Sequence, residues 1–357
     1  MPSFTLADVR DQTYKPRDSW WTVWLVDPLA SRLVKATANR TNITPNQLTV
    51  AALILGLLSA VCFFLADWYW LLTGALLFHL SFVLDCMDGK IARLKGNGSV
   101  FGSWLDYVFD RIRVLVCGIA LMGGQFAITG NPLFLWVLLA IVFTDMFRYL
   151  NSPQMAKVRS AMRRHIAQAI REVEEHAGEQ DTGRVRQAAG GFAGPDDNVN
   201  DGMGDEESSV SIGGAERVQA PAVASDDEET DEEGVITPNR KAKHLQSTAL
   251  QKGFDKRFPW YRRVRDMLWA NRIRPHLFSG IEFQMGVFIV APLVGMFSVT
   301  GMVATIIGSA VFMLTFEMLI IYKLWLSTRE FVRVTQNINE TLESLDLSGL
   351  ERHRPAA

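Results

Sequence analysis

Six long apolar stretches dominate this chain and limit what it can fold into. A helix of about 20 apolar residues crosses the hydrocarbon core of a bilayer, and a helix satisfies its own backbone hydrogen bonds there. We therefore predict an all-α fold, a polytopic membrane bundle of six transmembrane helices. The predicted spans are residues 47–67, 69–94, 100–125, 132–150, 281–299 and 301–325.

Four carboxylates interrupt the second and third stretches, at Asp85, Asp88, Asp106 and Asp110. Ionisable groups at membrane depth are costly and usually mark a functional site. Residues three or four apart share a helix face, so the four acids form two pairs, one on each helix. The short loop at 96–98 makes the two helices antiparallel, and the pairs can then converge.

Four acids in an apolar setting need compensating positive charge. Buried ion pairs with Lys90, Arg93 and Arg111 are the purely structural explanation, but three bases do not balance four acids. Mg2+ prefers carboxylate oxygens together with substrate phosphates, and two such ions stabilise both oxygens of a phosphoryl displacement. We predict a site for two Mg2+ ions, or Mn2+ in their place, with Asp85, Asp88 and Asp106 as ligands.

The whole pattern is D-x-x-D-G-x-x-A-R-x8-G-x-x-x-D-x-x-x-D, from Asp85 to Asp110. It resembles the signature of the CDP-alcohol phosphatidyltransferase family at every specified position. The resemblance implies six membrane helices, a polar cavity facing the cytosol, two divalent cations and a homodimer. It also implies that a CDP-linked donor gives its phosphoryl group to an alcohol and releases CMP. The last acid, Asp110, is then the general base, a role that does not exclude metal binding.

The remaining motif residues are expected to contact the donor. Gly89, Ala92 and Gly102 lack bulk where a ligand would approach the helices. The guanidinium of Arg93 suits the donor phosphates, and the alternative is that Arg93 extends to the membrane interface.

Two further donor contacts come from the resemblance alone. The family often has a Pro-Asn-x-x-Thr segment ahead of the first span, which here carries Asn46 and Thr49. We carry both over as nucleotide contacts. The alternative is ordinary helix-start chemistry, with Thr44 as the cap and Pro45 at the first helical position.

Basic residues near spans four and five are candidates for binding an anionic acceptor. For those before span five, the alternative is that they bind no substrate and only mark the cytosolic end of the span. At membrane depth we also expect an ion pair between Arg113 and Asp145 across the bundle. The acceptor candidates are Arg148, Arg272, Arg274 and His276.

Lysine and arginine gather at one set of span ends. The opposite connections, near 67–69, 126–131 and 299–301, carry almost none. By the positive-inside rule, both termini and the motif end of spans two and three face the cytosol, at the cell membrane if the organism is a bacterium. That side suits a donor activated by a cytosolic nucleotide.

Outside the spans we predict an N-terminal interfacial helix and a cytosolic insertion. Tryptophans beside basic residues at 19–40 suit the membrane interface, although an ordinary packing helix is the alternative. Residues 1–18 are expected to be flexible. From Glu172 to Gly234 there are 19 acids and 3 bases, a composition typical of disorder.

These features divide the chain into five parts. The parts are a cytosolic or interfacial segment (1–46), four spans with the motif (47–150), a cytosolic insertion (151–275, acidic at 172–234 and basic at 240–275), two spans (276–326) and a cytosolic tail (327–357).

Membrane lipids are the expected surroundings of the chain. The basic and aromatic run at 240–275 lies beside a span, and the net charge is −2, so nucleic acid is not an expected partner.

The motif defines a reaction but leaves its substrates open. In the favoured interpretation, CDP-diacylglycerol gives its phosphatidyl group to glycerol phosphate, inositol phosphate or serine in phospholipid biosynthesis. In the alternative, a soluble CDP-alcohol is the donor, and a lipid or polyol phosphate is the acceptor. A non-catalytic membrane scaffold, with the acidic loop recruiting partners, is a third interpretation. The complete set of motif acids argues against it.

Overall fold

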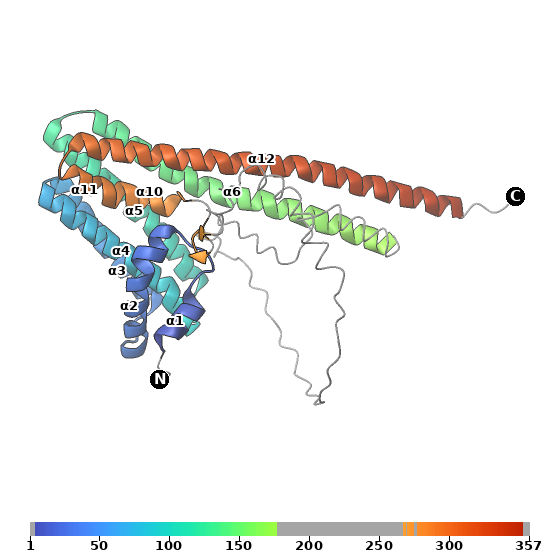
Figure 1. Ribbon diagram of the computed structural model, residues 1–357, viewed down its shortest axis with the longest axis horizontal. Helices are drawn as coiled ribbons and strands as arrows, with labels where there is room; N and C mark the ends of the chain where they lie inside the picture. The colour runs from blue at the N-terminus through green and yellow to red at the C-terminus, as the bar shows by residue number, and fades with distance from the viewer. Residues whose placement is uncertain (1–3, 177–266, 269, 275–276, 353–357) are drawn as a thin grey trace. The chain divides into compact units, whose positions relative to one another are not determined.

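The computed structural model describes residues 4–176, 267–268, 270–274 and 277–352. These residues form helices joined by short connections, with one isolated β-bridge between Asp18 and Ile273 (Figure 1). The prediction of an all-α fold is therefore confirmed for the described part of the chain. The first five residues of the segment predicted to be disordered, 172–176, form the end of a helix, so the prediction is wrong for them. The rest of that segment, and most of the basic run after it, lie outside the described residues.

The described helices begin with three short ones, and four long helices follow. The segment predicted as span five is a series of three short helical segments, and one more long helix comes after it. In chain order the elements are α1 Leu6–Thr13, η1 Thr22–Val26, α2 Asp27–Arg40, α3 Pro45–Leu65, α4 Trp68–Lys95, α5 Val100–Thr129, α6 Leu133–His176, α10 Gly280–Met285, η3 Gly286–Val290, α11 Ala291–Gly295 and α12 Val299–Arg352.

The chain divides into two compact units. The first includes Met1–Val158 and Arg263–Leu326, and it holds the motif and every residue discussed below. The second includes the last part of α6 and the last part of α12. Within the first unit, α3 packs against both α4 and α5 (Figure 1).

Among the described residues, five helices are long and apolar enough to cross a membrane: α3, α4, α5, α6 and α12. They match five of the six predicted spans. The segment predicted as span five forms helices of 6, 5 and 5 residues. At 1.5 Å per residue this run is about 24 Å long, less than the hydrocarbon core of about 30 Å. The count of six spans therefore stays a prediction.

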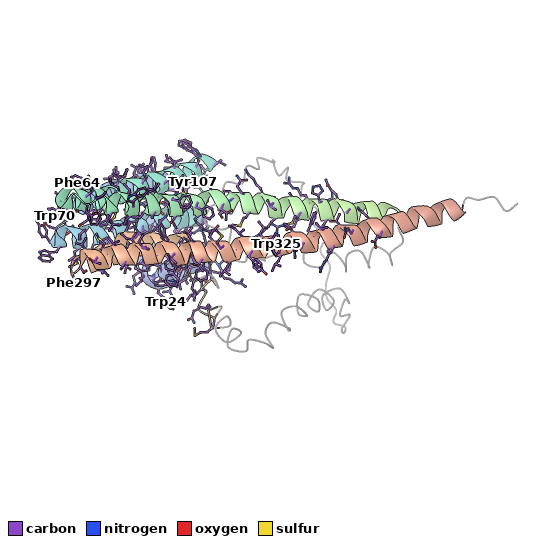
Figure 2. The ribbon with its side chains drawn as sticks, turned by 90° about the horizontal axis from the view of Figure 1, so that it is seen from above. Trp24, Phe64, Trp70, Tyr107, Phe297 and Trp325 are labelled. Carbon is purple, nitrogen blue, oxygen red and sulfur yellow. The ribbon has the colours of Figure 1, made fainter. Side chains whose placement is uncertain are left out.

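Aromatic side chains mark the connections away from the motif. Figure 2 shows Phe64, Trp70 and Phe297 gathered at one end of the bundle, where α3 meets α4 and α11 meets α12. Phe297 is 88% exposed. Exposed aromatic rings at helix ends are typical of a membrane–water interface.

Helix caps determine how α3, α4 and α5 meet. Thr44 caps α3 through a capping box with Gln47, and Pro45 is the first helical residue, as the sequence predicted. Helix α4 ends at Lys95 and is capped by Gly96, whose φ of 62° favours glycine. Ser99 then caps α5 by accepting a hydrogen bond from the backbone N–H of Gly102 at 3.0 Å. This tight turn sends α5 back beside α4.

The N-terminal segment is more ordered than the sequence suggested. The expectation that residues 1–18 are flexible is wrong for most of them, because α1 forms there. Thr5 and Asp8 make a capping box, and the backbone of Phe4 exchanges two hydrogen bonds with the side chain of Asn39, each 2.9 Å long. The Thr-x-x-Asp pattern of a capping box can be recognised in the sequence. The contact between this segment and α2 cannot, because the two are distant in the sequence.

Two acids of the N-terminal segment, Asp18 and Asp27, hold the chain that leads into α10. Across the β-bridge, the backbone N–H of Asp18 donates to the backbone oxygen of Arg272, and the backbone N–H of Arg274 donates to that of Asp18. The side chains of Asp18 and Arg274 pair at 3.0 Å. Asp27 pairs with Lys90 of α4 at 3.0 Å and with Arg272 at 3.4 Å. The side chains of Lys90 and Asp27 are only 5% and 4% exposed. The N-terminal segment therefore supplies buried negative charge to the motif helix and to the start of α10.

Replacing Asp27 with alanine should destabilise the protein, because two cations lose their partner and Lys90 stays buried. Loss of one partner of a buried pair costs about 3–5 kcal/mol. Thermal unfolding in detergent measures the effect, with exposed Asp11→Ala as the matched control. Equal melting temperatures for the two variants would contradict the assigned role of Asp27.

Candidate active site

Three of the four motif acids converge between α4 and α5. One carboxylate oxygen each from Asp85, Asp88 and Asp106 lies within 4.8 Å of the other two. Asp88 is 6% exposed, and the other two are partly buried. The predicted convergence of the two helices is thus present for these three acids, which we call the acidic triad.

The acidic triad is a suitable set of ligands for a divalent cation. Oδ1 of Asp106 is buried and has no hydrogen-bond partner among the described residues. A buried acceptor without a partner is costly, and a bound cation would satisfy it. Three carboxylates offering only oxygen match the preference of hard cations such as Mg2+. The identity and number of the ions stay predictions.

Asp110 lies one turn beyond Asp106 on α5 and outside the acidic triad. Its Oδ1 accepts a hydrogen bond from Nη2 of Arg113, and its Oδ2 lies 3.7 Å from Arg111. The side chain is 22% exposed, so a substrate hydroxyl could reach it. Its roles as general base and as a metal ligand both stay predictions.

The start of α3 adjoins the motif. The hydroxyl of Thr49 donates to Oδ2 of Asp88 at 2.5 Å, and it also lies 3.2 Å from the backbone oxygen of Pro45. A Cβ added to Gly102 would lie 2.7 Å from Oδ1 of Asn46. Both residues carried over from the family are therefore beside motif residues. Their contact with a nucleotide stays a prediction.

The other donor-binding candidates lie around the end of α4. A Cβ added to Gly89 would meet only the guanidinium of Arg93, at 3.8 Å, so there is space above this glycine. Ala92 is partly buried. Arg93 is exposed and has no ion pair within the described part of the chain. An unpaired arginine beside an open glycine is available to an anionic ligand.

The acceptor-binding candidates do not form one cluster. Arg148 on α6 lies 3.4 Å from buried Glu317 of α12, while Arg272 and Arg274 pair with the acids of the N-terminal segment. His276 lies outside the described residues. Acceptor binding by any of the four stays a prediction.

The predicted pair between Arg113 and Asp145 is wrong. Asp145 instead binds Arg111 at 2.6 Å and Nε2 of Gln284 at 3.2 Å, and Arg111 also stacks on the ring of Tyr149. Positions 111 and 113 are about 200° apart around a helix, so only one of them can face α6. Arg113 shares a face with Asp110 and points to the motif.

Sequence reasoning missed two charged partners of the site. Glu317 lies inside an apolar stretch, which was a usable signal of a buried role. Its carboxylate accepts hydrogen bonds from Arg148 and, at 2.5 Å, from Asn151. The sequence gives no comparable indication for Asp27, because its partner Lys90 is distant in the sequence.

The fold and the acidic triad together define a class: a helical integral membrane protein with a candidate metal site between two of its spans. Residues 42–173 match the family model for CDP-alcohol phosphatidyltransferase. This part of the chain is a CDP-alcohol phosphatidyltransferase domain, and the predicted family is confirmed. Members of the family transfer substituted phosphate groups.

Three curated proteins illustrate the similarity. A bifunctional IPC transferase and DIPP synthase of Aquifex aeolicus is 40% identical over 68 residues, 19% of this chain and 15% of that protein. The phosphatidylinositol phosphate synthase of Corynebacterium glutamicum is 36% identical over 88 residues, 25% of this chain and 37% of the other. The archaetidylinositol phosphate synthase of Pyrococcus horikoshii is 41% identical over 83 residues, 23% and 43% respectively. The chain thus spans less than half of each relative.

The bond between Thr49 and Asp88 should be needed to orient the acidic triad. Partners that orient metal ligands typically contribute about 10- to 100-fold in metal affinity or activity. Thr49→Val should weaken Mn2+ binding by that order, whereas Thr49→Ser should retain it. Thr73→Val is the matched control, since its hydroxyl only bonds the backbone of Tyr69. Unchanged Mn2+ affinity in Thr49→Val would contradict this role.

Proposed function

We propose that the protein is a metal-dependent transferase that moves a phosphatidyl group from a CDP-linked donor to the hydroxyl of a small polar alcohol and releases CMP. The observation that carries the proposal is the acidic triad, with its buried and unpartnered Asp106 oxygen, inside a CDP-alcohol phosphatidyltransferase domain. In the alternative, a soluble CDP-alcohol is the donor.

The residues of the site divide the chemistry among them. Asp85, Asp88 and Asp106 hold the divalent cations, two in number, which neutralise the donor pyrophosphate and its departing phosphate when bound. Arg93 binds the donor phosphates, since it is exposed and unpaired in the described structure. Asn46 and Thr49 contact the nucleotide, and Gly89, Ala92 and Gly102 leave room for it.

Asp110 takes the proton of the acceptor hydroxyl. A bond forms between the acceptor oxygen and the phosphorus that carries the lipid, and the bond from that phosphorus to the bridging oxygen breaks. CMP leaves with that oxygen, and the acceptor proton moves to the Asp110 carboxylate. The partial exposure of Asp110 and its place outside the acidic triad support this role.

The relatives' names guide the choice of substrates. One is named a phosphatidylinositol phosphate synthase and another an archaetidylinositol phosphate synthase, which supports a CDP-linked lipid as the donor. CDP-diacylglycerol and an inositol phosphate are therefore the first donor and acceptor to test. Arg148, Arg272, Arg274 and His276 remain the candidates for the acceptor phosphate. We further propose a homodimer in the lipid bilayer, with both termini and the site facing the cytosol.

CMP release by the purified full-length protein tests the function. The assay combines Mg2+, CDP-diacylglycerol and a panel of inositol phosphate, glycerol phosphate and serine. Release that depends on one acceptor supports the phosphatidyl transfer and names the product. Release only with a soluble CDP-alcohol donor would favour the alternative, and no release with either donor would favour a non-catalytic scaffold.

Replacing Asp110 with asparagine should lower kcat by about 100- to 10,000-fold, the usual range for losing a general base. The fold should survive because Arg113 keeps its second partner, Asp85. The melting temperature reports on folding, and Asp67→Asn at the opposite end of α4 is the control. Turnover at the wild-type rate in Asp110→Asn would exclude Asp110 as the base.

A further inference from the structure

Arg113 joins the first and last acids of the motif. It is a buried guanidinium on α5, 2% exposed. Its Nη1 donates to Oδ1 of Asp85 at 3.3 Å, and its Nη2 donates to Oδ1 of Asp110. A planar guanidinium with its donors in a rigid fork can hold two acceptors in a defined arrangement, which a lysine cannot do.

The neighbouring helices are shaped to hold this side chain. A Cβ added to Gly56 of α3 would lie 2.7 Å from both Cγ and Cδ of Arg113. On α4, Ser81 accepts a hydrogen bond from Nη1 at 3.1 Å and donates to the backbone oxygen of Ala52 at 2.6 Å. Arg113 is therefore fixed from both other helices of the site.

The positive charge of Arg113 is paired with acids of the motif. Lys90 has Asp27 as its partner. Arg111 has Asp145 at 2.6 Å, and its distance to the motif acid Asp110 is longer, 3.7 Å. The ion pairs of Arg113 within the described residues are both with motif acids. A fixed positive charge that contacts Asp85 repels a cation bound by the same carboxylate.

We propose that Arg113 is a positioning residue for the proposed reaction. Its fork holds the carboxylate of Asp110 outside the acidic triad, where Asp110 can accept the substrate proton. Its charge also weakens the affinity of the acidic triad for the divalent cation. The first effect deepens the proposed function and depends on it, whereas the second concerns metal binding alone.

Two substitutions separate the fork from the charge. Arg113→Gln removes both, so Mn2+ should bind at least about tenfold more tightly while kcat falls at least about tenfold. Arg113→Lys keeps the charge and loses the fork, so the Kd for Mn2+ should stay within about threefold of wild type while kcat still falls. Tighter metal binding combined with slower turnover is not expected from general damage to the fold.

Mn2+ binding is followed by the electron paramagnetic resonance signal of free Mn2+, using purified full-length protein and Mn2+ alone. Asp88→Asn should lose the binding, which identifies the acidic triad as the site. Weaker or unchanged Mn2+ binding in Arg113→Gln would overturn the proposal. An inactive wild-type protein would remove the proposed activity but leave the Mn2+ comparison as a complete test of the charge effect.

A second pair of variants tests positioning without altering any charge. Gly56→Ala pushes against the stem of Arg113. Gly74→Ala makes a similar clash with the ring of Phe63, 2.6 Å from the added Cβ. At matched amounts of folded protein, kcat should fall at least about threefold further in Gly56→Ala than in Gly74→Ala. Equal kcat values would overturn the positioning role.

Discussion

Repulsion among three carboxylates in an apolar helical bundle is the constraint on which the site depends. The ligand atoms of Asp85, Asp88 and Asp106 lie within 4.8 Å of one another, where water cannot fully solvate them. Burying like charges is strongly unfavourable unless cations neutralise them. Among the described residues, Arg113 is the cation that pairs with the acidic triad, and it contacts Asp85 but leaves an oxygen of Asp106 without a partner. A bound divalent cation is the natural completion of this arrangement.

The surrounding structure keeps other charges away from the acidic triad. Lys90 and Arg111 are close to it in sequence, but each is paired with an acid from another part of the chain, Asp27 or Asp145. The N-terminal segment is thus part of the electrostatic framework. The short turn after Gly96 sets α5 beside α4, and Thr49 connects α3 to Asp88. Local chain geometry and distant ion pairs act together to form the site.

Features with a short-range pattern were predictable from the sequence, and those that depend on long-range packing were not. Apolar length and motif spacing predicted the five long helices and the convergence of Asp85, Asp88 and Asp106. The ordering of α1 requires contact with α2, and the partners of Arg272 and Arg274 are more than 240 residues away. The pairing of Arg113 with Asp110 was predictable from the sequence, because Asp110 lies three residues earlier on the same helix face.

Anomalous X-ray scattering from crystals of the full-length protein soaked in Mn2+ tests the central claim most directly. Our account predicts an anomalous peak bound by carboxylate oxygens of Asp85, Asp88 and Asp106, and its loss in Asp88→Asn crystals. A well-ordered acidic triad with no peak, or Mn2+ bound only elsewhere on the protein, would contradict the account.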